Sequence, residues 1–189
     1  MLINYTIQRA RRRSISVSVK DDGTVLVKAP YFMSESAVRS FVYEKQGWIS
    51  KRLALVEKSR NEAQKLGLLS AEELALVKKK AKKLIPERVA YYSELSGISY
   101  GRISIRLQKS RWGSCSIRGN LNFNCLLVLM PEEILDSVVV HELCHRRHMN
   151  HSKAFYAEVL RLFPKYRECS AWLKQNGPIY LSRANHCGT

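Results

Sequence analysis

The sequence predicts an α+β fold, because strand patterns and helix patterns occupy separate stretches of the 189-residue chain. Residues 2–29 and 102–130 carry the alternating or β-rich patterns that are typical of strands. Residues 34–65 and 70–97 are helix-forming over several turns. We therefore expect small sheets combined with long helices.

The N-terminal region predicts a small antiparallel β-sheet followed by a helix. Hydrophobic residues alternate with serines over residues 15–19, the letters DDG supply a turn, and residues 25–27 form the returning strand. Ser34 is expected to begin a helix in which Gly47 is the weak point. We interpret residues 1–69 as an accessory region made of this sheet and helix.

A second long helix is expected to begin at Ser70, which forms a capping-box pattern with Glu73. Pro86 predicts a kink or a break within it, and Gly97 predicts its end. The helix carries a run of lysines that could form a polyanion-binding face or a solvated flank: Lys78, Lys79, Lys80, Lys82 and Lys83.

Residues 70–189 are expected to form the catalytic region. Residues 102–107 and 119–130 predict two strands, joined by a loop over residues 108–118. Pro131 then occupies a position that suits the first turn of a helix, and two glutamates follow it at the end of the helix dipole that favours negative charge. This helix leads directly into a histidine cluster.

The cluster, with the sequence HELCHRRHMNH at residues 141–151, contains four of the five histidines of the chain. His141 and His145 are four residues apart, so in a helix they share one face and can bind the same metal ion. Glu142 is the next residue round and lies beside that face, where a carboxylate can deprotonate a metal-bound water. The spacing therefore predicts a catalytic metal site, for which zinc is the usual ion.

A catalytic zinc site needs a third protein ligand. His148 cannot complete a tetrahedral site from a straight helix, whereas His151 can reach the metal if the chain turns near Asn150, a residue type that tolerates the left-handed conformation. Ser152 supports such a break because it is a good N-cap for a new helix. We therefore predict His151 as the third ligand, with Glu158 as the alternative.

The charge of the chain is strongly basic. Its 32 lysines and arginines exceed its 16 acidic residues, which gives a formal net charge of +16 and a pI near 9.9. Such an excess attracts polyanions, of which nucleic acid is the most usual, although a solvated basic surface has the same composition.

The sequence also indicates a cellular compartment. No apolar run reaches the roughly 20 residues of a membrane span, and the N-terminus lacks the apolar core of a secretory signal. The five cysteines form no CxxC pair, so reduced thiols are expected. We therefore expect a cytoplasmic protein that has no membrane partner.

Three stretches together resemble the YgjP-like metallopeptidases, which are related to SprT-like and other zincin proteases: VVVHELCHRRHMNHSKAFY, RWGSCS and RRRSISVSV. The resemblance covers nearly the whole chain. It implies a zincin-like fold, one zinc ion, and hydrolysis of peptide bonds in protein or peptide substrates. His141, His145 and His151 match the ligands of the family, and Glu142 matches its general base.

Several further residues are candidates for contacts with the substrate or with the metal ligands: His148, Arg111, Trp112 and Tyr156. The loop RWGSCS could line the cleft, or it could be a turn in which Trp112 fills the core and Gly113 bends the backbone. The spacing of the three histidines equals that of metzincins, but His148 stands where that pattern has glycine, so the turn must be formed differently.

Two other functions remain open. A basic nucleic-acid-binding protein with a structural zinc would explain the charge, but it has no use for Glu142 and would need a fourth protein ligand. Metal-dependent hydrolysis of a non-peptide amide would use every one of these residues. We favour a zinc metallopeptidase. The basic charge together with the SprT-like kinship suggests one that acts on proteins bound to nucleic acid.

Overall fold

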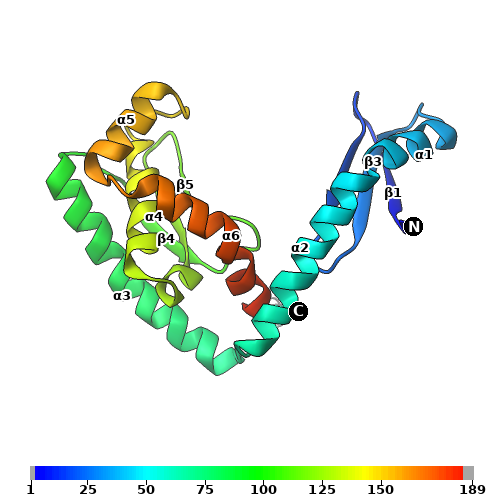
Figure 1. Cartoon of the computed structure of the whole chain (residues 1–189). Coiled ribbons are helices and arrows are strands. Elements are labelled where there is room, and N and C mark those ends of the chain that lie inside the picture. Colours follow the sequence, from blue (N-terminus) through cyan, green and yellow to red (C-terminus); the bar gives the residue numbers. More distant parts are fainter. Residues whose placement is uncertain (1–2, 185–189) are drawn as a thin grey trace. The chain divides into compact units, whose positions relative to one another are not determined.

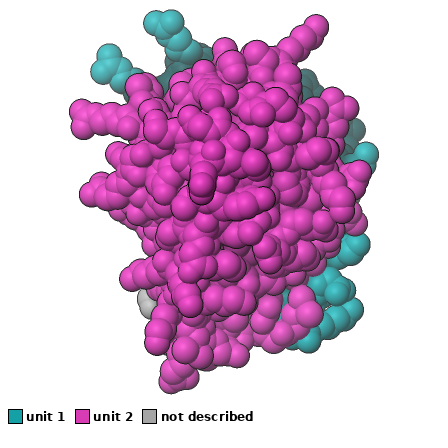
Figure 2. Space-filling model, turned by 90° about the vertical axis from the view of Figure 1, so that its left-hand side faces the viewer, with its two compact units in different colours: residues 1–65 teal, residues 66–189 magenta. Residues whose placement is uncertain are grey.

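The computed structural model describes residues 3–184 and divides the chain into two compact units, Met1–Lys65 and Leu66–Thr189 (Figures 1 and 2). This division lies four residues before the boundary that the sequence predicts after residue 69. Each unit combines short strands with helices, which confirms the α+β class. No helix among the described residues is both long and apolar enough to cross a membrane.

The first unit is a three-stranded sheet followed by two helices: β1 (Thr6–Ala10), β2 (Ser16–Val19), β3 (Val25–Pro30), α1 (Glu35–Glu44) and α2 (Gln46–Lys65). The strand order is β1-β3-β2. Alternate residues of β3 are buried and pack with residues of α1 and α2 to form the core of this unit: Val25, Val27, Ala29, Val38, Val42 and Ile49. As expected, Ser34 caps α1, and its hydroxyl accepts a hydrogen bond from the Ala37 N–H.

The predicted antiparallel pairing of residues 15–19 with residues 25–27 is confirmed, but the N-terminal sheet as a whole is mixed and not antiparallel throughout. β2 pairs with β3 antiparallel, whereas β1 pairs with β3 parallel. The alternation of hydrophobic residues specifies which face of a strand is buried, but it does not specify the neighbour or the direction of pairing. β3 is the central strand, so the connection that leads from β1 to β2 crosses the end of β3.

The second unit contains a second three-stranded sheet and four α-helices: α3 (Ala71–Ser96), β4 (Ile103–Arg106), β5 (Gly113–Cys115), β6 (Leu121–Asn124), the 3-10 helix η1 (Cys125–Leu129), α4 (Glu132–Cys144), α5 (Lys153–Leu162) and α6 (Tyr166–Ala184). The strand order is β4-β6-β5, so β5 is an edge strand. β5 lies within the predicted loop 108–118, and η1 replaces the second half of the strand predicted over residues 119–130. A short run of buried apolar residues does not distinguish a strand from a buried helical turn.

Helix α3 is limited by the signals that the sequence predicts. Ser70 and Glu73 form both hydrogen bonds of the capping box, and Gly97 ends the helix in the left-handed conformation with φ 66°. Pro86 lies inside the continuous helix α3, so the alternative that it breaks the helix was wrong. Ile85 and Val89, on either side of the proline, are fully buried, and this packing keeps the segment helical.

Helix α4 is at the centre of the second unit, where it contacts α3, α5, α6, β5 and η1 (Figure 1). The apolar stripe of Leu135, Val139 and Leu143 on this helix is buried in the core. A partly buried ion pair joins α4 to α3, in which the Arg88 Nε donates to the Asp136 Oδ1 over 2.7 Å. These contacts fix the helix that carries the first two histidines.

Candidate active site

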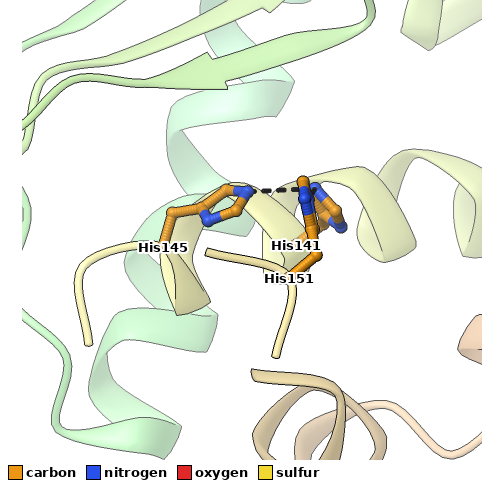
Figure 3. A group of neighbouring side chains, drawn as sticks. All are labelled: His141, His145 and His151. Atoms are coloured by element: carbon orange, nitrogen blue, oxygen red, sulfur yellow. Dashed lines mark hydrogen bonds between the residues drawn. The ribbon is translucent and has the colours of Figure 1, made fainter. Parts of the chain in front are cut away.

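Three histidine side chains meet at one point beside the C-terminal end of α4 (Figure 3). The Nε2 atom of His141 lies 3.2 Å from the Nε2 atoms of both His145 and His151. His141 and His145 come from the end of α4, and His151 comes from the segment just before α5. The structure thus brings together the three residues that the sequence predicts as metal ligands.

The geometry of the three nitrogens fits a zinc ion. Zinc–nitrogen bonds of about 2.0–2.1 Å at tetrahedral angles separate two ligand nitrogens by about 3.3 Å. The pKa of His141 is lowered to about 4 by burial and by the neighbouring His145 and His151. The pKa of His145 is also lowered, mainly by burial. Both imidazoles are therefore neutral at pH 7, which is the form that binds a metal.

The chain reverses between His145 and His151 without a left-handed residue. The Arg146 N–H donates to the Leu143 carbonyl over 3.0 Å, so the end of α4 tightens before the chain leaves the helix. Among the described residues, only glycines have positive φ, and the expectation that Asn150 is left-handed was therefore wrong.

Two arginines hold this reversal in place. Arg146 Nε donates to the Ser99 carbonyl over 3.1 Å, and Arg147 Nη2 donates to the Ser96 carbonyl over 2.9 Å. Arg147 also pairs with Glu158, which accepts a second pair from Arg161. The carboxylate of Glu158, the alternative third ligand, is therefore bonded to two arginines and is not part of the histidine cluster.

The rings of the cluster are oriented by Tyr166, His148 and Phe155, of which the sequence predicts only His148. The Tyr166 hydroxyl lies 2.8 Å from the Nδ1 atom of His141. The His145 Nδ1 lies 3.0 Å from the backbone carbonyl of His148, which acts here through its main chain. Phe155 is fully buried, and its ring centroid lies 4.6–5.0 Å from those of all three histidines. Such contacts fix the ring orientation of metal ligands.

Glu142 lies beside the histidine cluster and is 6% exposed. Burial raises the pKa of its carboxyl group to about 8 in the absence of a cation. A cation at the neighbouring imidazoles would favour the ionised carboxylate and lower this pKa. The strand β5 approaches closely, because a Cβ added at Gly113 would lie 2.6 Å from the Glu142 Oε1. Only glycine at this position leaves room for the carboxylate.

A pocket of about 230 Å³ opens next to His141 and Glu142. Its walls come from α4, from α6 and from the start of β5 with the two residues before it, namely Arg111, Trp112 and Gly113. Trp112 also packs against α6, since a Cβ added at Gly177 would lie 2.9 Å from its ring. The two interpretations of the loop RWGSCS therefore do not exclude each other. The loop lines a pocket, and Trp112 also packs against α6.

Tyr156 is the remaining candidate contact residue. It lies on α5, its side chain is 40% exposed, and its ring centroid lies 6.1 Å from that of His151.

An α+β unit whose central helix carries two histidines and a glutamate in the H-E-x-x-H pattern has the architecture of a metallopeptidase. The chain belongs to the YgjP-like metallopeptidase family, since the model of the YgjP-like metallopeptidase domain matches residues 13–77 and 69–176. A search of curated proteins gave no match.

Two solved structures are similar to about half of the chain. The metallopeptidase zymogen abylysin of Pyrococcus abyssi is 20% identical, with a TM-score of 0.44, and the match covers 48% of this chain and 93% of that one. The metallopeptidase zymogen jannalysin of Methanocaldococcus jannaschii is 26% identical, with a TM-score of 0.45, and the match covers 49% of this chain and 96% of that one.

Proposed function

We propose that the chain is a zinc-dependent peptidase with a zincin-like catalytic unit, in which His141, His145 and His151 hold one zinc ion and Glu142 is the general base. The observation that supports this most strongly is the convergence of three imidazole Nε2 atoms, with two pairs at 3.2 Å, beside a buried glutamate. Three protein ligands leave a fourth position open, as catalytic zinc requires and structural zinc does not.

Glu142 acts first as general base and then as general acid in the proposed reaction. Zinc bound at the three imidazoles would lower the pKa of a water to about 7 and polarise the scissile carbonyl. The carboxylate of Glu142 accepts the proton of the attacking water and later donates it to the leaving amine. Tyr166 and the carbonyl of His148 hold the rings of His141 and His145 in the orientation that binding requires.

The edge strand β5 offers a position for the substrate backbone. One side of β5 pairs with β6, and the opposite side is the edge of the sheet. An extended peptide can add to such an edge as a further strand. The pocket lined by Arg111 and Trp112 is next to the carboxylate of Glu142 and would receive a side chain of the bound peptide.

The negative charge that develops on the carbonyl oxygen needs a hydrogen-bond donor. His148, Arg111 and Tyr156 are the candidates. We favour Tyr156, because its ring lies near that of His151 and its side chain is partly exposed toward solvent.

We also propose that the substrates include proteins bound to nucleic acid. The net charge of +16 supports this proposal, since it favours binding to the same polyanion that carries the substrate.

The first experiment measures cleavage of a DNA-binding protein by the zinc-loaded chain, with and without DNA. Glu142→Gln is the control variant, because it removes the base and leaves the three imidazoles. Cleavage that requires Glu142 supports the peptidase, and cleavage that also requires DNA supports the choice of substrate. Absence of cleavage in both conditions, with zinc bound, would favour a structural zinc site or hydrolysis of another amide.

A further inference from the structure

Arginines and exposed aromatic residues gather at one end of the sheet in the first unit. β1 and β3 run parallel with Ala10 opposite Pro30, so Arg11 and Tyr31 leave the sheet side by side. β3 lies between β1 and β2, and the connection over residues 11–15 must therefore cross the end of β3. This connection contains three consecutive arginines.

Two of these arginines are available to a ligand. Arg11 and Arg13 are exposed, and neither forms an ion pair with a carboxylate in residues 3–184. Arg12 is half-buried and donates to the Ser16 hydroxyl over 2.9 Å, which anchors the connection between its two neighbours.

Acidic groups near this end are few. Asp21 and Asp22 lie in the turn between β2 and β3, at the opposite end of the sheet. Glu35 begins α1 shortly after the aromatic pair, but its carboxylate lies 3.6 Å from Arg39. The sheet therefore has an electropositive end.

Two aromatic side chains project from the same end. Tyr31 is 71% exposed and Phe32 is 80% exposed, although aromatic residues of this size usually bury most of their surface. Arg9 fixes the turn that carries them, because its Nη1 donates to the carbonyls of Pro30 and Met33. The backbone position of the two rings is thus set before any ligand arrives.

We propose that this arginine–aromatic edge, defined as Arg11, Arg13, Tyr31 and Phe32, binds single-stranded nucleic acid. Unpaired bases stack on exposed aromatic rings, and guanidinium groups bind the phosphates between them. An acidic peptide would use the arginines but would leave two exposed aromatic rings without a role. A duplex would present phosphates while its bases remain stacked on each other.

The inference deepens the nucleic-acid part of the proposed function and is independent of the metal site. Binding can be measured by fluorescence anisotropy with labelled oligothymidine and the full chain. Tyr31→Ala/Phe32→Ala is expected to weaken binding about tenfold or more, since stacking contributes about 1–3 kcal/mol per base. Tyr43→Ala is the matched control, because Tyr43 is 72% exposed in the same unit and lies outside the edge.

The phosphate contacts are tested through the salt dependence of binding. Arg11→Ser/Arg13→Ser is expected to reduce the slope of log K against log salt by about 1.4, or about 0.7 for each lost contact with a single strand. Lys79→Ser/Lys83→Ser removes the same charge from exposed positions on α3 and is expected to change the affinity less than twofold. Tyr31→Phe keeps the stacking face and is expected to bind as the unmodified chain does.

Three outcomes would overturn the proposal. The first is normal binding by Tyr31→Ala/Phe32→Ala. The second is binding by Lys79→Ser/Lys83→Ser that is as weak as binding by Arg11→Ser/Arg13→Ser. The third is heparin binding that depends on the edge as strongly as oligothymidine binding does. The last outcome would assign the edge to polyanions without bases. The Glu142→Gln variant keeps the edge and is expected to bind oligothymidine as the unmodified chain does. If the unmodified, zinc-loaded chain binds through the edge but cleaves no protein, that result would contradict only the proposed enzyme.

Discussion

Replacing Gly113 with alanine tests whether Glu142 acts from the position that the structure gives it. The new Cβ would lie 2.6 Å from both the Cγ and the Oε1 of Glu142. Ordinary carbon contacts are about 3.5–4.0 Å, so the carboxylate must move by about 1 Å. The side chain of Glu142 yields more easily than the backbone of β5, and the three atoms nearest to the new Cβ all belong to Glu142.

A misplacement of about 1 Å in a reacting group lowers the rate about 100-fold, or about 2.7 kcal/mol in the activation free energy. We therefore expect Gly113→Ala to reduce kcat/KM on a peptide substrate by about this factor while it retains one zinc per chain. The assay combines the kinetics with elemental analysis of the purified variant and a thermal melt.

Gly47→Ala is the matched control, because the same substitution in α2 meets no atom within 4 Å and should leave the kinetics unchanged. Full activity of Gly113→Ala with full zinc content would refute the assignment of Glu142 as the base. Loss of zinc from Gly113→Ala would instead show that the perturbation reaches the histidines.

Three other measurements examine the surroundings of the site. Tyr166→Phe removes the hydroxyl from the Nδ1 atom of His141 and should weaken zinc binding about 10- to 100-fold in competition with a chelator, whereas unchanged affinity would contradict an orienting role. Asp136→Asn removes the charge that pairs with the partly buried Arg88, which keeps Glu132 as a second partner, and should lower the free energy of unfolding in urea by about 2 kcal/mol; an unchanged free energy of unfolding would contradict this. Zinc at 100 times the Kd of the unmodified chain should add about 2.7 kcal/mol of stability to that chain and should also stabilise Glu142→Gln, because the three imidazoles remain in the variant; no gain in the variant would contradict the assignment of the ligands to the histidines.

Local chemistry made the helix limits predictable. Ser34, Ser70 and Ser152 each accept a hydrogen bond from a backbone N–H of the helix that follows, and Gly97 takes the left-handed conformation at the end of α3. These signals depend on neighbouring residues in the sequence. The direction of β1 in the first sheet depends on a partner about 20 residues away, and nothing in the alternation of β1 or β3 encodes it.

The site shows the same difference between local and distant determinants. The shared face of His141 and His145 follows from helix geometry, and the predicted position of Glu142 beside it follows too. Phe155 and Tyr166 could not be identified in this way. Tyr166 is 25 residues from His141 in sequence, and its place beside the ring results from the packing of α6 against α4.

The position of His151 depends on contacts that begin some 50 residues upstream. Arg146 and Arg147 attach the reversal to the carbonyls of Ser99 and Ser96, which flank the left-handed Gly97 at the end of α3. The metzincin pattern places a flexible glycine within the corresponding spacing. In this chain, two arginines attach the reversal to the turn that Gly97 forms at the end of α3. The sequence RRH can therefore occupy the loop without a left-handed residue, and the third imidazole is positioned by α3 as well as by its own segment.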